Sequence, residues 1–73
     1  MIINGNLNLE SSSVDSLGKL KEVKGYLDLN NSKITSLSNG LEVKGSLYLS
    51  NTKITQSYIK LNFPELLNQC IWN

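Results

Sequence analysis

Hydrophobic and polar residues alternate in three short runs that lie 20 residues apart along the chain. The shared unit reads V/I-x-G-x-L-x-L-x-x-S/T-x-V/I and begins at Ile3, Val23 and Val43. In the second unit, Leu27 and Leu29 alternate with polar positions, which is the pattern of a strand with one buried face. A fixed short period predicts stacked turns of similar shape instead of a globule folded around one centre.

The alternation also predicts which side chains share a column on successive turns. Three such strands must run parallel, about 4.8 Å apart, with their leucines facing one interior. The two inward columns are Leu7, Leu27 and Leu47, then Leu9, Leu29 and Leu49. Gly25 also falls on the inward side, where a side chain would collide with Val23 or with the neighbouring turn.

A column of hydroxyl groups follows the predicted strands at Ser12, Ser32 and Thr52, beside asparagines that favour turns. We expect these hydroxyls to satisfy backbone groups inside the corner of each turn. Two apolar residues three positions apart then follow, as in Ile34 and Leu37. That step predicts one turn of α-helix or 3₁₀ helix on the return path.

The last part of the chain has the periodicity of a helix. Pro64 suits a first helical position, and Glu65 suits the positive end of the helix dipole. Apolar residues with i, i+4 spacing continue the pattern at Leu66, Leu67, Cys70 and Ile71. The tail therefore predicts a helix over residues 64–72 that covers one end of the stack, with Phe63 and Trp72 as its strongest sealing residues.

The run from Leu27 to Leu37, L-x-L-x-x-S-x-I-x-x-L, resembles a leucine-rich repeat, whose pattern is L-x-L-x-x-N-x-L-x-x-L. Runs from Leu7 and Leu47 repeat it, and the period of 20 resembles the short units of bacterial and phage proteins. Ser or Thr stands where the family has Asn. The resemblance, over residues 3–56, implies a binding scaffold with the strands lining one face.

The predicted fold is thus an α/β solenoid, a leucine-rich-repeat-like stack of three short parallel strands with a C-terminal capping helix. We expect residues 1–57 to form the three repeats and residues 58–73 to form the cap. At 73 residues the chain is one domain at most.

Composition excludes several classes of function. The net charge is +1, which gives no electrostatic reason to expect nucleic acid or a membrane surface as a partner. Histidine is absent, so His-based catalysis and His metal sites are excluded, and the carboxylates are too dispersed for acid–base chemistry. We expect no enzymatic activity, metal or cofactor. One cysteine, Cys70, cannot form an internal disulfide and suits a reducing cytoplasm. We expect it to be a small apolar residue.

The outward positions of the predicted strands are the candidate binding residues: Asn6, Asn8, Tyr26, Asp28, Ser46 and Tyr48. Tyrosine is enriched in protein-binding hot spots, although it also favours strands for packing reasons alone. Asp28 could anchor a basic side chain of a partner, or it could be a solvated surface charge.

The N-terminal end of the stack carries no predicted cap. Ile2 and Ile3 lie beside its edge strand, and bare edges pair with other chains. The leading hypothesis is a protein-binding module, either an adaptor or a small phage-type inhibitor of a host protein. The alternative is a self-associating structural protein, a homodimer or a stacked assembly joined through this edge.

Overall fold

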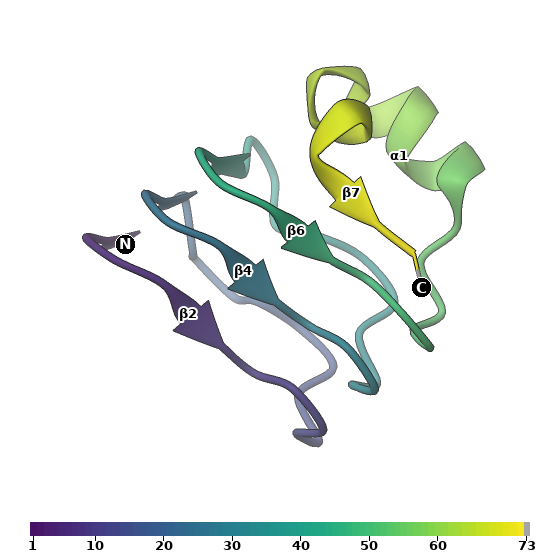
Figure 1. Ribbon diagram of the computed structural model, residues 1–73, viewed down its shortest axis with the longest axis horizontal. Coiled ribbons are helices and arrows are strands. Elements are labelled where there is room, and N and C mark those ends of the chain that lie inside the picture. Colours follow the sequence, from purple (N-terminus) through teal and green to yellow (C-terminus); the bar gives the residue numbers. More distant parts are fainter. Residues whose placement is uncertain (73) are drawn as a thin grey trace.

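The computed structural model describes residues 1–72 and contains two parallel sheets, one short α-helix and one 3₁₀ helix, an α/β arrangement (Figure 1). The first sheet has the order β1 (Ile2–Ile3), β3 (Glu22–Val23), β5 (Glu42–Val43). The second has the order β2 (Leu7–Asn8), β4 (Leu27–Asp28), β6 (Leu47–Tyr48), β7 (Cys70–Ile71). Between β6 and β7 come α1 (Gln56–Asn62) and the 3₁₀ helix η1 (Pro64–Gln69).

Successive 20-residue units pair in the register that the sequence predicts. Leu7 pairs with Leu27 and Leu27 with Leu47, all in parallel strands. The same shift of 20 joins Ile3 to Val23 and Val23 to Val43 in the other sheet. Each unit therefore supplies one strand to each sheet, and the expectation of one strand per unit is corrected to two. The additional strand, which the sequence did not predict, forms at the start of the unit, before the glycine.

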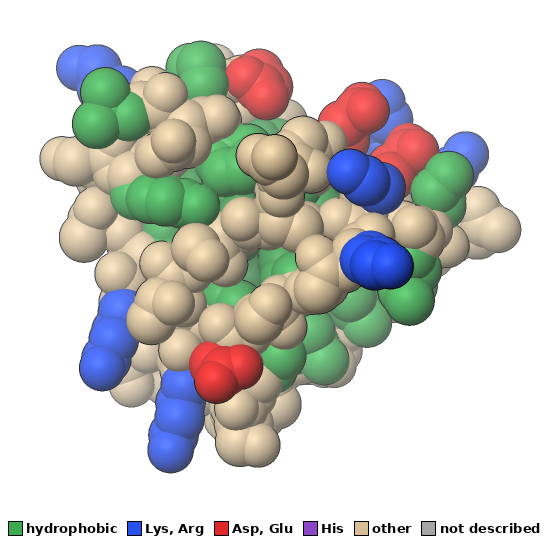
Figure 2. All heavy atoms as spheres, turned by 180° about the vertical axis from the view of Figure 1, so that it is seen from behind, with side chains coloured by type: hydrophobic (Ala, Val, Ile, Leu, Met, Phe, Trp, Pro, Cys, Tyr) green, Lys and Arg blue, Asp and Glu red, His purple; other side chains and the backbone are tan. Residues whose placement is uncertain are grey.

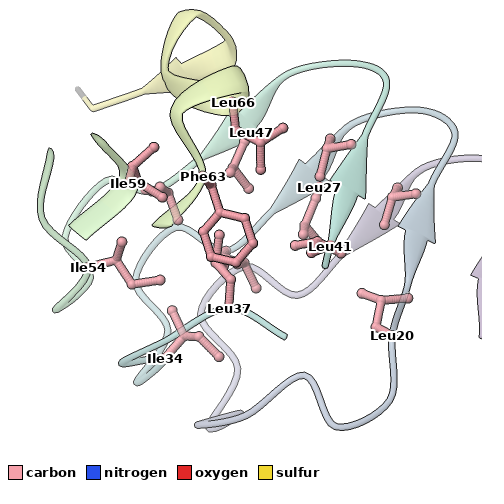
Figure 3. Packing of buried hydrophobic residues seen from close by; sticks show 14 residues of the cluster. Leu20, Leu27, Ile34, Leu37, Leu41, Leu47, Ile54, Ile59, Phe63 and Leu66 are labelled. Carbon is pink, nitrogen blue, oxygen red and sulfur yellow. The ribbon is translucent and has the colours of Figure 1, made fainter. Parts of the chain in front are cut away.

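One hydrophobic core runs between the strands and the return segments. Its inward leucines, Leu27, Leu29 and Leu47, are completely buried, as is Ile34 of the return segment. Figure 3 shows side chains from all of these elements pointing into one cluster. Phe63 reaches the same cluster from the C-terminal end, where it is 6% exposed. The apolar columns of the sequence thus become one continuous interior.

The corner after each of β2, β4 and β6 contains one residue in the left-handed region. Ser11, Asn31 and Asn51 have φ angles of 58°, 61° and 57°. Asparagine tolerates this region better than other residues with a side chain. The two asparagines also stack, because the Asn51 Nδ2 donates to Asn31 Oδ1 at 2.8 Å. The first corner has serine instead and lacks this amide ladder.

Replacing Ser11 by asparagine should stabilise the protein. The change relieves the left-handed strain and places an amide next to that of Asn31, which we expect to add about 0.5–1 kcal/mol. Thermal unfolding followed by circular dichroism should show Tm rising by about 4 °C. Ser13→Asn is the control, because Ser13 is exposed and has no positive φ. Equal Tm values for the two variants would contradict this explanation of the corner.

The predicted hydroxyl column satisfies the backbone in two of its three positions. Ser12 Oγ accepts from the Val14 N–H at 3.4 Å, and Thr52 Oγ1 accepts from the Ile54 N–H at 3.3 Å. Thr52 Oγ1 also donates to the Leu49 carbonyl at 2.9 Å. Ser32 Oγ is buried without a hydrogen-bond partner, so the prediction is wrong for the middle turn.

Glycine is required where adjacent turns approach each other. A Cβ atom built on Gly45 would lie 2.9 Å from the Gly25 carbonyl carbon and oxygen. A Cβ atom on Gly25 would lie 1.9 Å from Asn6 Oδ1, and one on Gly5 would meet no atom within 4 Å. The predicted close approach is therefore to the neighbouring turn and not to Val23.

The tail differs from its prediction of a helix over residues 64–72. The α-helix lies earlier, in α1, where the Thr55 side chain accepts from the Tyr58 N–H at 3.2 Å. Pro64 begins a 3₁₀ helix, and the chain becomes extended at Cys70, where β7 pairs with β6. Residue 73, part of the predicted cap, lies outside the described residues. No helix among residues 1–72 is both long enough and apolar enough to cross a bilayer.

Candidate partner-binding face

The outer surface of the sheet β2–β4–β6–β7 brings the predicted binding residues together. Figure 1 shows this sheet lying uncovered along one side of the molecule, with α1 at its far end. Asn8, Asp28 and Tyr48 follow one another across three strands, as their register requires. We refer to the outward side chains of this sheet as the strand face.

The centre of the strand face is an aromatic pair. The Tyr26 and Tyr48 rings lie with centroids 5.9 Å apart and planes at 87°, an edge-to-face contact. Both residues are half-buried, so each ring is braced by its neighbour and still has an accessible surface. A braced aromatic ring loses little conformational entropy on binding, which is why such rings suit a contact with a partner.

The strand face extends beyond the predicted residues to Ile71. Tyr48 pairs with Ile71, so the Ile71 side chain is the next outward residue after Tyr48. It is half-buried, and it does not belong to the core cluster that includes its neighbours Cys70 and Trp72. Together Tyr26, Tyr48 and Ile71 form an apolar strip across three adjacent strands.

Sequence reasoning missed Ile71 because the tail was interpreted as helical. Cys70 and Ile71 fit the i, i+4 spacing of a helix stripe, and two residues are too few to show strand alternation. The local signal for the strand is weak. The pairing partner of β7 is more than 20 residues earlier in the chain, in β6.

Three of the polar candidates already accept hydrogen bonds from backbone N–H groups. Asn6 Oδ1 accepts from the Tyr26 N–H of the next turn at 2.9 Å. Asn8 Oδ1 accepts from the Glu10 N–H at 2.9 Å, and Asp28 Oδ1 accepts from the Asn30 N–H at 3.0 Å. The carboxylate of Asp28 is therefore held in one orientation beside the tyrosine pair. Its second oxygen is left to attract a cation.

The remaining strand-face candidate, Ser46, is half-buried next to the tyrosines. Its carbonyl accepts from the Leu27 N–H at 2.9 Å, which joins the second and third turns. The structure thus places all six predicted residues on strands or strand ends of one sheet, with their backbones in register.

The two isoleucines of the predicted edge occupy different faces. Ile2 is 55% exposed and pairs with Glu22, on the outer side of the first sheet. Ile3 is half-buried and pairs with the inward Val23, so it belongs to the interior at the open end. Both lie on β1, which is an edge strand.

Chemically reactive features are sparse in the described residues. Burial raises the pKa of the Cys70 thiol, which disfavours the nucleophilic thiolate, and its Sγ donates to the Leu66 carbonyl at 3.3 Å. Within residues 1–72 no cluster of three or more His, Cys, Asp or Glu side chains is placed to hold a metal ion. A hollow of about 240 Å³ lies away from the strand face, between β5 and η1.

Figure 2 shows the opposite side of the molecule, where lysine and acidic side chains gather at the upper right and a few others lie apart. The one ion pair described joins Lys44 to Glu42 at 3.5 Å, and both side chains are exposed. Such a surface pair adds little to stability.

Comparison of the chain with protein-family models, curated proteins and solved structures gave no match.

Proposed function

We propose that this chain is a leucine-rich-repeat-like solenoid that acts as a non-enzymatic protein-binding module through its strand face. The observation that carries the proposal is the apolar strip of Tyr26, Tyr48 and Ile71 on an otherwise polar sheet surface. Strand hydrogen bonding and the packed core fix the positions of these residues. A partner therefore meets a surface that is already organised, and binding costs little ordering entropy.

The chemistry of the strand face suggests what kind of protein surface would fit. A partner would place apolar or aromatic side chains against the strip. It would place a lysine or arginine near Asp28, whose carboxylate adjoins the tyrosine pair in the register Asp28–Tyr48. A cation there would contact both a carboxylate and aromatic rings. Adaptors and phage-type inhibitors of a host protein are the roles we expect for so small a module.

Truncating either tyrosine of the strip should weaken binding strongly without unfolding the protein. In an affinity capture from the organism that encodes the chain, Tyr26→Ala and Tyr48→Ala should each weaken retention of the partner at least about 10-fold, as hot-spot truncations do. Asp28→Ala should weaken it less, since one carboxylate oxygen already serves the backbone. Titration of the recovered partner by calorimetry gives the affinities.

The matched control is Tyr58→Phe, which alters a tyrosine of α1 away from the strand face. Tyr58 OH accepts from the Leu37 N–H at 3.1 Å, so this variant should lose some stability but retain the partner. Circular dichroism must show that every variant is folded. A partner that is captured equally by the Tyr26 and Tyr48 variants, with both folded, would overturn the proposal.

A further inference from the structure

The N-terminal end of the stack exposes the apolar residues that the later turns bury. Leu9 is half-buried, whereas Leu29 and Leu49 at the equivalent positions are 0% and 1% exposed. Five inward residues of the first turn are half-buried in the same way, although Leu20 of its return segment is buried: Ile3, Leu7, Leu9, Val14 and Leu17. Figure 2 shows hydrophobic side chains along its lower right edge, where the first turn lies. We call this surface the open face.

Edge strands border the open face on both sheets. β1 and β2 each pair on one side alone, with β3 and β4. Their other sides are strand edges next to half-buried apolar side chains. Such an edge readily pairs with another strand.

The tail covers the third turn at the C-terminal end of both sheets. β7 covers β6, with Cys70 opposite Leu47. Gln69 closes the first sheet, because its Nε2 donates to the Val43 carbonyl and, at 2.7 Å, to the Gly45 carbonyl. In the earlier turns the equivalent carbonyls accept from the next turn, as Val23 does from the Lys44 N–H at 2.9 Å. In the first sheet, the carbonyls that another copy would meet at the C-terminal end are therefore already occupied, whereas in the second sheet β7 is the outermost strand.

The two ends of the first turn carry different exposed charges, while exposed Asp15 lies on the return segment and half-buried Glu22 follows Lys21. Glu10 is exposed at the end where β2 runs into its corner. Lys19 and Lys21 are exposed at the opposite end, where both contact Met1: the Met1 nitrogen donates to the Lys19 carbonyl at 3.3 Å, and the Lys21 N–H donates to the Met1 carbonyl at 2.8 Å. If a second copy is rotated by 180° about an axis that lies in the plane of the open face and runs across β2, these two ends exchange places. The acidic end of one copy then lies over the basic end of the other.

We propose that a second copy of this chain covers the open face in a closed dimer, with the two β2 strands antiparallel across a two-fold axis. The apolar residues of the two first turns pack together, and Glu10 of each copy faces Lys19 of the other. The strand face points away from this contact and remains available. Because a two-fold contact uses the open face of both copies, association stops at two copies.

The size of the open face sets the strength of the dimer. The molecule measures 26 × 26 × 20 Å, so a cross-section buries at most roughly 500 Å² per copy, near the lower limit for a specific interface. We expect micromolar affinity. Sedimentation from about 1 µM to about 1 mM protein should therefore cover the transition. The weight-average mass should rise from 8.1 kDa towards twice that value and then level off.

Charge reversal tests the dimer without touching the core. Glu10→Lys should raise the dimer Kd by about 10-fold or more, because it creates two like-charge contacts. Lys19→Glu should do the same, and the double exchange Glu10→Lys with Lys19→Glu should restore the original Kd. Leu61→Lys is the control: Leu61 is 82% exposed on α1, and its loss should leave the dimer unchanged.

Each remaining outcome decides against the proposal. A monomer throughout the concentration range would exclude a second copy as the occupant. Species that grow beyond two copies would contradict a two-fold contact between open faces. A dimer that is unaffected by Glu10→Lys, or one that the double exchange fails to restore, would exclude the antiparallel arrangement of the open faces. None of these outcomes bears on partner binding by the strand face.

Discussion

Replacing Leu29 by alanine should remove most of the free energy of unfolding of the protein. Leu29 is completely buried in the middle turn, with the first turn on one side and the third on the other. Removing three buried carbons and leaving a cavity costs about 2–5 kcal/mol. A core in a chain of this size supplies only about 3–5 kcal/mol of net stability. The cost is therefore comparable to the whole free energy of unfolding.

The equivalent leucine of the first turn provides the control. Leu9 is half-buried at the open face, so Leu9→Ala should cost about 1–2 kcal/mol and leave a folded protein. Urea unfolding, followed by circular dichroism and by the fluorescence of the single tryptophan, Trp72, measures both variants. Equal losses at Leu9 and Leu29 would contradict the graded burial from the open end to the middle of the stack.

Alanine at Gly45 should be the second severe substitution. The new methyl group would lie 2.9 Å from the Gly25 carbonyl group and 3.0 Å from the Tyr26 nitrogen, and these backbone atoms cannot rotate away. The second and third turns would have to separate. This would weaken the hydrogen bond from the Gly45 N–H to the Gly25 carbonyl, in which the nitrogen and oxygen are 3.0 Å apart. We expect a loss of about 2–3 kcal/mol.

The three repeat glycines form an internal series for this prediction. Gly5→Ala meets no atom within 4 Å and should change stability by less than about 0.5 kcal/mol. Gly25→Ala should fall between the two, because its closest contact is with the movable side chain of Asn6, and the Gly5 carbonyl carbon lies 3.1 Å away. The new methyl group would displace Asn6 Oδ1 from the Tyr26 N–H. Urea midpoints in any other order would contradict the direct stacking of the turns at these positions.

The periodic part of the fold could be predicted because the same information occurs three times. Leu7, Leu27 and Leu47 are equally spaced, and the register that this spacing implies is the register of the strands. The second strand of each unit was missed because Glu22 and Val23 form a run of two residues, too short to show alternation.

The tail was harder because each of its segments occurs once. Thr55 is a good N-cap for α1, but it sits inside the third repeat, so the periodic interpretation hid it. Pro64 does begin a helical segment, although of the 3₁₀ type. Cys70 and Ile71 are extended because the edge of β6 requires a partner, and that requirement is not visible in the local sequence.

The residues of the candidate site also divide into those that the repeats predict and those that depend on the tail. Tyr26, Asp28 and Tyr48 could be placed on one surface from the repeat alone, and the edge-to-face contact of the tyrosines follows from their diagonal positions. Ile71 could not be placed on this surface from the repeat, because it lies there only through the pairing of β7 with β6. The use of Asp28 Oδ1 by the Asn30 N–H was also not predictable from the columns, since it depends on the shape of the corner.

The most direct test of the stacked interior is a methyl NOE spectrum of the protein with labelled leucines. Leu27 lies between Leu7 and Leu47 in register, with strands about 4.8 Å apart, so its methyl groups should show cross-peaks to both. Leu29 should likewise contact Leu9 and Leu49. Folded protein in which Leu27 shows no contact with Leu7 or Leu47 would contradict the stack, and with it the strand face and the open face.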